Sequence, residues 1–177
     1  MTFKSTSLFN IELHETFIPK LNSQYWISQL NDIIELDPKG VEKSNGKGYQ
    51  SSTLVDNPNF FPLINNLSNL LKTYFPKEVI IDTMWGNISP PGSFNWPHAH
   101  SIFGTEVYAG VLYLQVPKNS GEIMFQHPLA KNSSLYKVMP VNNQLIIFPG
   151  YLTHSVDVNK SNDVRISIAF NFECKDR

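Results

Sequence analysis

The chain of 177 residues lacks several features that would each point to a class of protein. It has a single cysteine, Cys174, so it can build neither an intramolecular disulfide nor a metal site made of thiolates. Its 14 basic and 15 acidic side chains nearly balance and form no block of one sign, so we expect no nucleic-acid partner. No stretch has the apolar length of a signal-peptide core or a membrane span, so we expect a cytoplasmic protein with no membrane partner.

What the chain does contain is sufficient for one packed core. Hydrophobic residues make up 41% of it, and no linker, repeat or low-complexity segment divides it, so we expect a single domain over residues 1–177. Residues 1–77 are expected to form a helical, N-terminal support. Their patterns predict an edge strand over 9–13, amphipathic helices over 21–37 and 57–75, and a loop or short extended piece over 43–52.

Residues 78–177 are expected to form a β-sheet core. They contain short runs rich in β-branched and aromatic residues, separated by Pro, Gly, Asn and Ser. The runs are 78–89, 106–116, 121–126, 134–140, 143–149, 153–158 and 164–172. No helix-length gap separates them, which indicates antiparallel pairing in a sandwich or barrel. The expected class is mainly β with α (α+β), with the helices packed on one sheet.

Two of the five histidines, His98 and His100, are separated by one residue in the segment NWPHAHS. In an extended chain, side chains two residues apart point the same way, so the two imidazoles can reach for one metal ion. His154 follows a buried strand and a Pro-Gly turn, which would place it at the mouth of a barrel as the third ligand. His14 and His127 are expected to be ordinary surface or hydrogen-bonded core residues.

The C-terminal strand predicts an anion site beside this metal. The polar turn NKSN favours a hairpin about Asn159 and Lys160, which would place Arg165 directly opposite His154. An arginine fork with the hydroxyl of Ser167 suits a carboxylate, so a metal nearby could chelate a 2-oxo acid. Alternation along the strand puts Arg165, Ser167, Ala169 and Asn171 on the cavity side, and Ile166, Ile168, Phe170 and Phe172 on the core side under the helices.

From about Lys43 to its end, the chain resembles the Fe(II)- and 2-oxoglutarate-dependent oxygenases, specifically a little-characterised subgroup of bacteria and phages. The resemblance lies in the segments WGNISPPGSFNWPHAHS, AGVLYLQVPKNSGEIMF, FPGYLTHSVDV and RISIAFNF. It implies a double-stranded β-helix, or cupin-like jelly roll, with Fe(II), 2-oxoglutarate as co-substrate, and O2. It also implies hydroxylation of an unidentified small-molecule or peptide substrate, with release of succinate and CO2.

The resemblance also assigns roles by position. His98 and His154 match metal ligands, and His100 stands where most of the superfamily has a carboxylate, which leaves the site one charge more positive. The subgroup itself commonly has histidine there. The co-substrate is implied to contact Arg165, Ser167 and Tyr113, and Asn87 to contact either the co-substrate or the substrate. Trp85 and Trp96 are candidates for the lining of the substrate entrance, although tryptophans are usually large packing residues. The chain departs from the subgroup at His127, where an acidic residue is common, and at Leu129, where an arginine is.

The sequence leaves two other functions open. A three-histidine iron site could instead bind a thiol or another small molecule directly and add oxygen to it without an oxo acid. A jelly roll of this kind could also be a non-catalytic binding or structural protein. The oligomeric state is open, with a homodimer among the options, and so are the roles of His127 and of the 43–52 loop.

Overall fold

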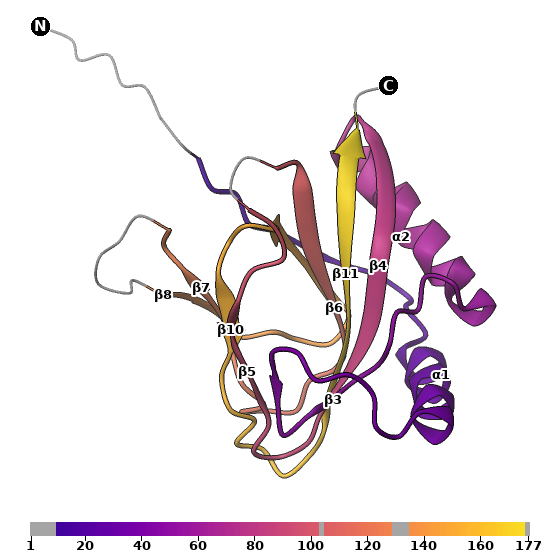
Figure 1. The fold of residues 1–177 in the computed structure, drawn as a ribbon, viewed down its shortest axis with the longest axis vertical. Coiled ribbons are helices and arrows are strands. Elements are labelled where there is room, and N and C mark those ends of the chain that lie inside the picture. Colours follow the sequence, from indigo (N-terminus) through magenta and orange to yellow (C-terminus); the bar gives the residue numbers. More distant parts are fainter. Residues whose placement is uncertain (1–9, 103–104, 129–134, 176–177) are drawn as a thin grey trace, which may run out of the picture.

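The computed structural model describes residues 10–102, 105–128 and 135–175, which form two antiparallel β-sheets flanked by two α-helices (Figure 1). In chain order the elements are β1 (His14–Phe17), α1 (Ser23–Leu36), β2 (Asn45–Gly46), β3 (Tyr49–Gln50), a 3₁₀ helix (Pro58–Phe60), α2 (Phe61–Tyr74), β4 (Glu78–Ser89), β5 (Phe94–His98), β6 (Val107–Gln115), β7 (Ile123–Gln126), β8 (Leu135–Val138), β9 (Gln144–Pro149), β10 (His154–Val156) and β11 (Arg165–Lys175).

The chain passes from one sheet to the other at most of its connections. The larger sheet has the strand order β1-β9-β6-β11-β4-β3, and the smaller sheet has the order β2-β5-β10-β7-β8. From β4 onward, β4, β6, β9 and β11 belong to the larger sheet, and β5, β7, β8 and β10 belong to the smaller one. This confirms the predicted double-stranded β-helix and the class, mainly β with α. Each of the seven predicted runs corresponds to one strand, although β11 extends past its predicted run to Lys175.

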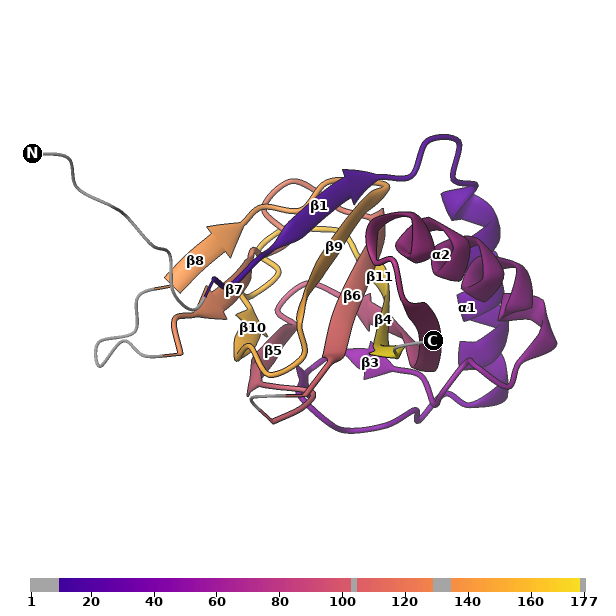
Figure 2. The same cartoon turned by 90° about the horizontal axis from the view of Figure 1, so that it is seen from above.

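Both helices cover the outer face of the larger sheet, as Figure 2 shows. Leu30 of α1 and Leu67 and Leu71 of α2 are buried in one cluster with Ile168 and Phe170 of β11. Burial of each such side chain contributes about 1.5–3 kcal/mol relative to exposure, which explains why two 14-residue amphipathic helices stay folded here. The predicted packing of the helices on one sheet is therefore confirmed.

The other face of β11 looks into the space between the sheets. Arg165, Ser167 and Ala169 line a pocket there, while the residues between them pack under the helices, as the alternation predicts. A second apolar cluster fills the rest of this space, and its buried members are Ala109, Tyr113, Ile123, Phe125, Val138, Ile146, Phe148 and Leu152. The pocket is therefore enclosed by side chains from both sheets.

The predicted hairpin about Asn159 and Lys160 is wrong. β10 pairs with β5 and β7 in the smaller sheet, whereas β11 pairs with β4 and β6 in the larger one. The connection between them crosses from sheet to sheet, and the buried Asn159 holds it there. Its amide nitrogen donates to the carbonyl oxygens of Ser89 and Asp163, both at 2.8 Å. His154 and Arg165 therefore belong to opposite sheets.

Other differences from prediction concern short segments. The N-terminal edge strand is β1, which begins at His14, after the predicted 9–13, and pairs with β9. The predicted loop over 43–52 contributes β2 to the smaller sheet and β3 to the larger one. β5 was absent from the predicted runs because Asn95 and Pro97 interrupt its apolar pattern. In the described ranges, no helix has the length and apolar character to span a membrane.

Candidate active site

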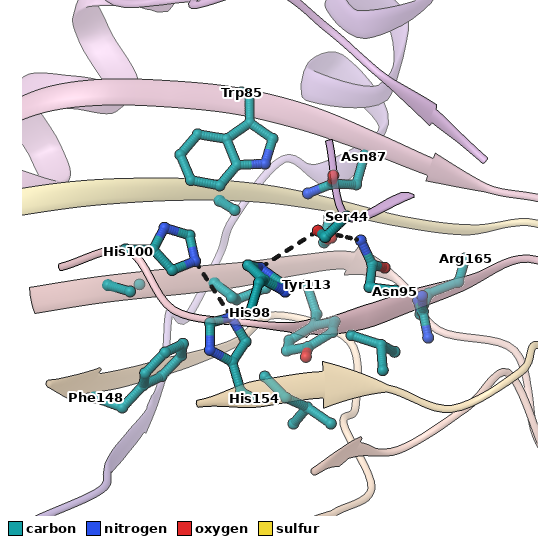
Figure 3. Close-up of a pocket in the computed structure, with 17 residues that line it drawn as sticks. Ser44, Trp85, Asn87, Asn95, His98, His100, Tyr113, Phe148, His154 and Arg165 are labelled. Carbon is teal, nitrogen blue, oxygen red and sulfur yellow. Dashed lines mark hydrogen bonds between the residues drawn. The ribbon is translucent and has the colours of Figure 1, made fainter. Parts of the chain in front are cut away.

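Three histidine side chains converge between the two sheets (Figure 3). His98 ends β5 and pairs with His154 at the start of β10, so the two strands present their imidazoles side by side. His100 follows two residues later, where its backbone N–H donates to the carbonyl oxygen of Gly150 at 2.8 Å. One ring nitrogen from each histidine lies within 4.8 Å of the others, and Nε2 of His100 is 3.3 Å from Nε2 of His154.

The separation of the His100 and His154 nitrogens, and the chemistry of the three rings, fit a metal ion. Nitrogens bound to one ion at about 2.1 Å lie about 3.0–3.4 Å apart for bond angles of about 90–109°. Nδ1 of His98 is 2.7 Å from the carbonyl oxygen of Trp96, and Nδ1 of His154 is 3.0 Å from that of Leu152. In each of these two rings, a hydrogen on Nδ1 would donate to the carbonyl oxygen, and the Nε2 atom would be free to bind an ion.

Burial keeps the three imidazoles neutral, which is the form that binds a metal. Desolvation is the largest cause at each of them. It lowers the pKa of His98, lowers the pKa of His100 to about 4 together with the charge of His98, and lowers the pKa of His154 well below its usual range. None of the three imidazoles therefore has to lose a second proton before it binds a metal at neutral pH.

Arg165 lies in the same pocket, at the end away from His100 (Figure 3). It is only 3% exposed, and its guanidinium donates to the carbonyl oxygens of Ser120 (2.8 Å) and Gly121 (3.4 Å) and to Oγ of Ser89 (3.2 Å). Because a guanidinium has five N–H bonds, these three hydrogen bonds leave some of the donors of Arg165 available to a ligand. Within residues 10–102, 105–128 and 135–175, no carboxylate forms a salt bridge with it, and burial lowers its pKa.

A row of polar side chains crosses the larger sheet next to Arg165. Ser167 of β11 pairs with Tyr113 of β6 on one side and with Asn87 of β4 on the other, and all three line the pocket. Burial raises the pKa of Tyr113 to about 12, so its hydroxyl keeps its hydrogen and can donate to an anion. The predicted contacts of a co-substrate therefore lie together, on the sheet opposite His98 and His154.

The pocket opens past the histidines into an outer groove of about 680 Å³. Ser44, Trp85, His98 and His100 line both spaces. The Trp85 ring stacks on the His100 ring, with centroids 5.5 Å apart and planes 16° apart. Trp96, which is 60% exposed, lines the groove as well, so both tryptophans border the same space.

Three further residues of the site carried no assignment from the sequence. Ser44 lies in the 43–52 segment, with Oγ 3.4 Å from Nε2 of His98, and Asn95 donates to the same Oγ at 3.2 Å. The segment SNGKGYQS, which begins at Ser44, resembles the subgroup's pattern but suggests no role for this serine, because Ser44 reaches His98 only through the pairing of β2 with β5. Asn171 shares the cavity-facing alternation of β11 and lines the outer groove near His100.

The remaining histidines lie outside the site. His14 packs on the ring of Tyr74, with centroids 4.6 Å apart. His127 lines a separate surface pocket between the N-terminal segment and β8. Leu129, where the subgroup commonly has arginine, lies outside the described residues.

Comparison with known proteins agrees with this geometry. Solved structures with similar folds include SnoK, an alpha-ketoglutarate-dependent carbocyclase from nogalamycin biosynthesis, at a TM-score of 0.74 and 10% identity over 92% of this chain and 79% of that one. A Pseudomonas putida prolyl-4-hydroxylase has a TM-score of 0.63 and 14% identity over 92% of each chain. HygX from Streptomyces hygroscopicus, solved with nickel and 2-oxoglutarate, has a TM-score of 0.67 and 11% identity over 93% and 82%.

These structures establish the shared fold, and a family model establishes membership. No curated protein is similar enough to be matched to this chain. Residues 83–171, about half of the sequence, match the family described as "Putative 2OG-Fe(II) oxygenase". This segment contains the three histidines, Arg165 and Ser167. The chain therefore belongs to the Fe(II)- and 2-oxoglutarate-dependent oxygenases.

Proposed function

We propose that His98, His100 and His154 hold the Fe(II) of this oxygenase, and that Arg165 with Ser167 anchors 2-oxoglutarate. The buried Arg165 is the observation that carries the co-substrate assignment. A buried cation without a partner is costly, and its free N–H donors suit a carboxylate bound at two points. An anionic co-substrate held there would supply the missing charge and could extend toward the histidines at the other end of the pocket.

Each residue then has a defined part in the reaction. The iron, together with 2-oxoglutarate and O2, supplies the oxidising chemistry that side chains lack. Arg165 and Ser167 orient the co-substrate, and the Tyr113 hydroxyl donates to its distal carboxylate. The apolar walls formed by Phe148 and Ile123 exclude water from the space around the histidines. We propose that the outcome is hydroxylation of the substrate, with release of succinate and CO2.

The outer groove is the proposed substrate site, because it adjoins His98 and His100 on the side away from Arg165. Its walls combine two tryptophans with the hydroxyl and amide groups of several side chains, which are Ser44, Gln50, Ser51, Ser52, Thr53, Thr83 and Asn171. Among the described residues that line it, Lys43 is the one charged side chain of fixed sign. We therefore propose a small polar substrate that is neutral or anionic.

The co-substrate assignment is tested with Arg165→Gln. Calorimetry under nitrogen would measure 2-oxoglutarate binding to Fe(II)-loaded protein. A hydrogen bond to a charged group contributes about 1.5–3 kcal/mol, so we expect about 10- to 100-fold weaker 2-oxoglutarate binding and an Fe(II) affinity within about threefold of the parent. Ser89→Ala is the matched control, because it removes one hydrogen bond of Arg165 but keeps the guanidinium. Equal 2-oxoglutarate affinity in Arg165→Gln would show that Arg165 does not hold the co-substrate.

The absence of a carboxylate from the proposed ligand set favours one alternative, an iron site that adds oxygen to a substrate without an oxo acid. Oxygen consumption by the Fe(II)-loaded protein separates the two reactions. The proposed function requires that consumption depends on added 2-oxoglutarate and matches the succinate formed. Oxygen uptake with a thiol panel in the absence of 2-oxoglutarate would select the alternative.

A further inference from the structure

The three proposed ligands are held in different ways. His98 and His154 each place Nδ1 against the carbonyl oxygen of the residue two positions earlier. His100 has no such carbonyl among the hydrogen bonds of the described residues, although its backbone is fixed by Gly150. An imidazole can bind an ion through Nε2 only when its remaining hydrogen lies on Nδ1, a requirement that a carboxylate ligand does not have. A third histidine therefore needs an acceptor for that hydrogen.

The short distance between His100 and His154 determines which nitrogen of His100 must carry the hydrogen when an ion is bound. Their Nε2 atoms are 3.3 Å apart, so they can share either one hydrogen or one ion. Nδ1 of His154 already faces the carbonyl oxygen of Leu152, which favours a lone pair on its Nε2. When an ion takes the place of the shared hydrogen, the hydrogen of His100 must lie on Nδ1.

Asn171 offers a buried acceptor near this ring. Its Nδ2 donates to Oγ1 of Thr83 at 2.9 Å. The Thr83 hydroxyl donates its own hydrogen to Oδ1 of Asp82 at 3.1 Å, so it accepts from Asn171, and the other end of the Asn171 amide is the oxygen. Its Oδ1 is buried and has no hydrogen-bond partner of good geometry among the described residues. Asn171 and His100 line the same outer groove, so this oxygen lies near the imidazole. A buried oxygen left unpaired is costly, so a small turn of the ring or amide that pairs it is favoured.

The sheet itself places Asn171 there. Thr83 and Asn171 are directly paired between β4 and β11, and the register shifts by one residue immediately after them. Such bulges redirect side chains next to functional sites. Trp85, two residues along β4, stacks on the same imidazole, so the ring of His100 lies against this strand pair.

We propose that Asn171 is a positioning residue for the metal centre: its Oδ1 accepts the Nδ1 hydrogen of His100, and Thr83 holds the amide in the orientation that makes this possible. The inference rests on the proposed function, because it presupposes that His100 binds the ion through Nε2. Strand β11 would then serve both ligands: Arg165 and Ser167 would bind the co-substrate, and Asn171 would orient a ligand of the metal. Such outer partners of metal-binding histidines typically change metal affinity about 10- to 100-fold.

The test compares variants at both positions, with Co(II) and Zn(II) as probes. Asn171→Leu keeps the volume and removes the acceptor, and we expect about 10- to 100-fold weaker Co(II) binding in titrations followed by the visible spectrum. Asn171→Asp keeps an acceptor oxygen and should bind Co(II) within about threefold of the parent or more tightly. Thr83→Val, which frees the amide to rotate, should fall between them. Unchanged denaturation midpoints would confirm that each variant is folded.

A second readout does not depend on affinity. In Zn(II)-loaded parent protein, long-range proton–nitrogen NMR should show a protected Nδ1 hydrogen on His100, assigned with the His100→Gln variant. The signal should persist in Asn171→Asp and be lost, or exchange rapidly, in Asn171→Leu. A protected Nδ1 hydrogen and parental Co(II) affinity in Asn171→Leu would overturn the proposal for Asn171 alone. Failure of the parent itself to bind Co(II) would instead overturn the proposed metal site.

Discussion

At the scale of single residues, the proposed metal site depends on imidazoles that stay neutral when buried. Desolvation lowers the pKa of His100 to about 4 in the folded protein, whereas an unfolded chain has a histidine pKa of about 6.5. At a pH between these two pKa values, His100 is protonated in the unfolded chain but not in the folded protein. The free energy of unfolding should therefore fall as the pH decreases from about 6.5 to 4, by up to about 3 kcal/mol from this residue.

This prediction is checked by urea denaturation at pH 7 and pH 4.5 in the presence of a chelator. His100→Gln replaces the imidazole with a neutral side chain, so it should lose less stability than the parent over the same interval. The variant His14→Gln is the control, because that imidazole lies outside the site. Equal pH dependence in the parent and in His100→Gln would show that the burial of His100 does not perturb its titration.

The residues found from sequence share one property, which is that local spacing defines them. His98 and His100 point to one place because they are two residues apart, and the alternation of β11 puts Arg165 and Ser167 on one face. The contact of Ser44 with His98 spans 54 positions, and it depends on which strands become neighbours. Periodicity in a single segment contains no information on that choice, so such partners emerge only from the fold.

At the scale of elements, the difference between local spacing and strand pairing explains why the hairpin predicted about Asn159 and Lys160 is wrong. The polar turn between β10 and β11 has a composition suited to a hairpin, but turn composition does not specify whether the next strand joins the same sheet. The buried Asn159 instead fastens the connection to Ser89, at the end of β4. Strand identity was predictable because β-branched and aromatic runs are local, whereas strand pairing is a property of the whole sandwich.

A prediction at this scale concerns the close packing of β6 on β11. A methyl group added at Gly110 would collide with the ring of Phe170, which is fully buried under the helices. We expect Gly110→Ala to lower the free energy of unfolding by about 1–3 kcal/mol, measured by urea denaturation. Gly86→Ala on β4 is the matched control, since it meets the terminal methyl groups of Leu30, which can rotate away. Metal affinity should change in neither variant, because the added methyl group would point in each case to the helix-covered side of the sheet. A smaller loss in Gly110→Ala than in Gly86→Ala would contradict this view of the packing.

At the scale of the whole molecule, the proposed roles are divided between the sheets. His98 and His154 belong to the smaller sheet, whereas Arg165, Ser167 and Tyr113 belong to the larger one, which the helices support from outside. A co-substrate that contacts both the iron and Arg165 would therefore connect the two sheets. The single domain expected over residues 1–177 stays a prediction, although β1, β2 and β3 join residues before 78 to both sheets.

This division predicts that metal and co-substrate stabilise the fold cooperatively. Ni(II) at about 100 times its Kd should stabilise the protein by about 2.7 kcal/mol, which raises the Tm of a chain of this size by about 5–10 °C. 2-Oxoglutarate alone should have little effect, because it would touch the larger sheet only. The two together should raise the Tm by more than the sum of their separate shifts, since each ligand strengthens the binding of the other. Arg165→Gln should keep the shift due to Ni(II) and lose the cooperative part, whereas strictly additive shifts in the parent would mean that no ligand connects the two sheets.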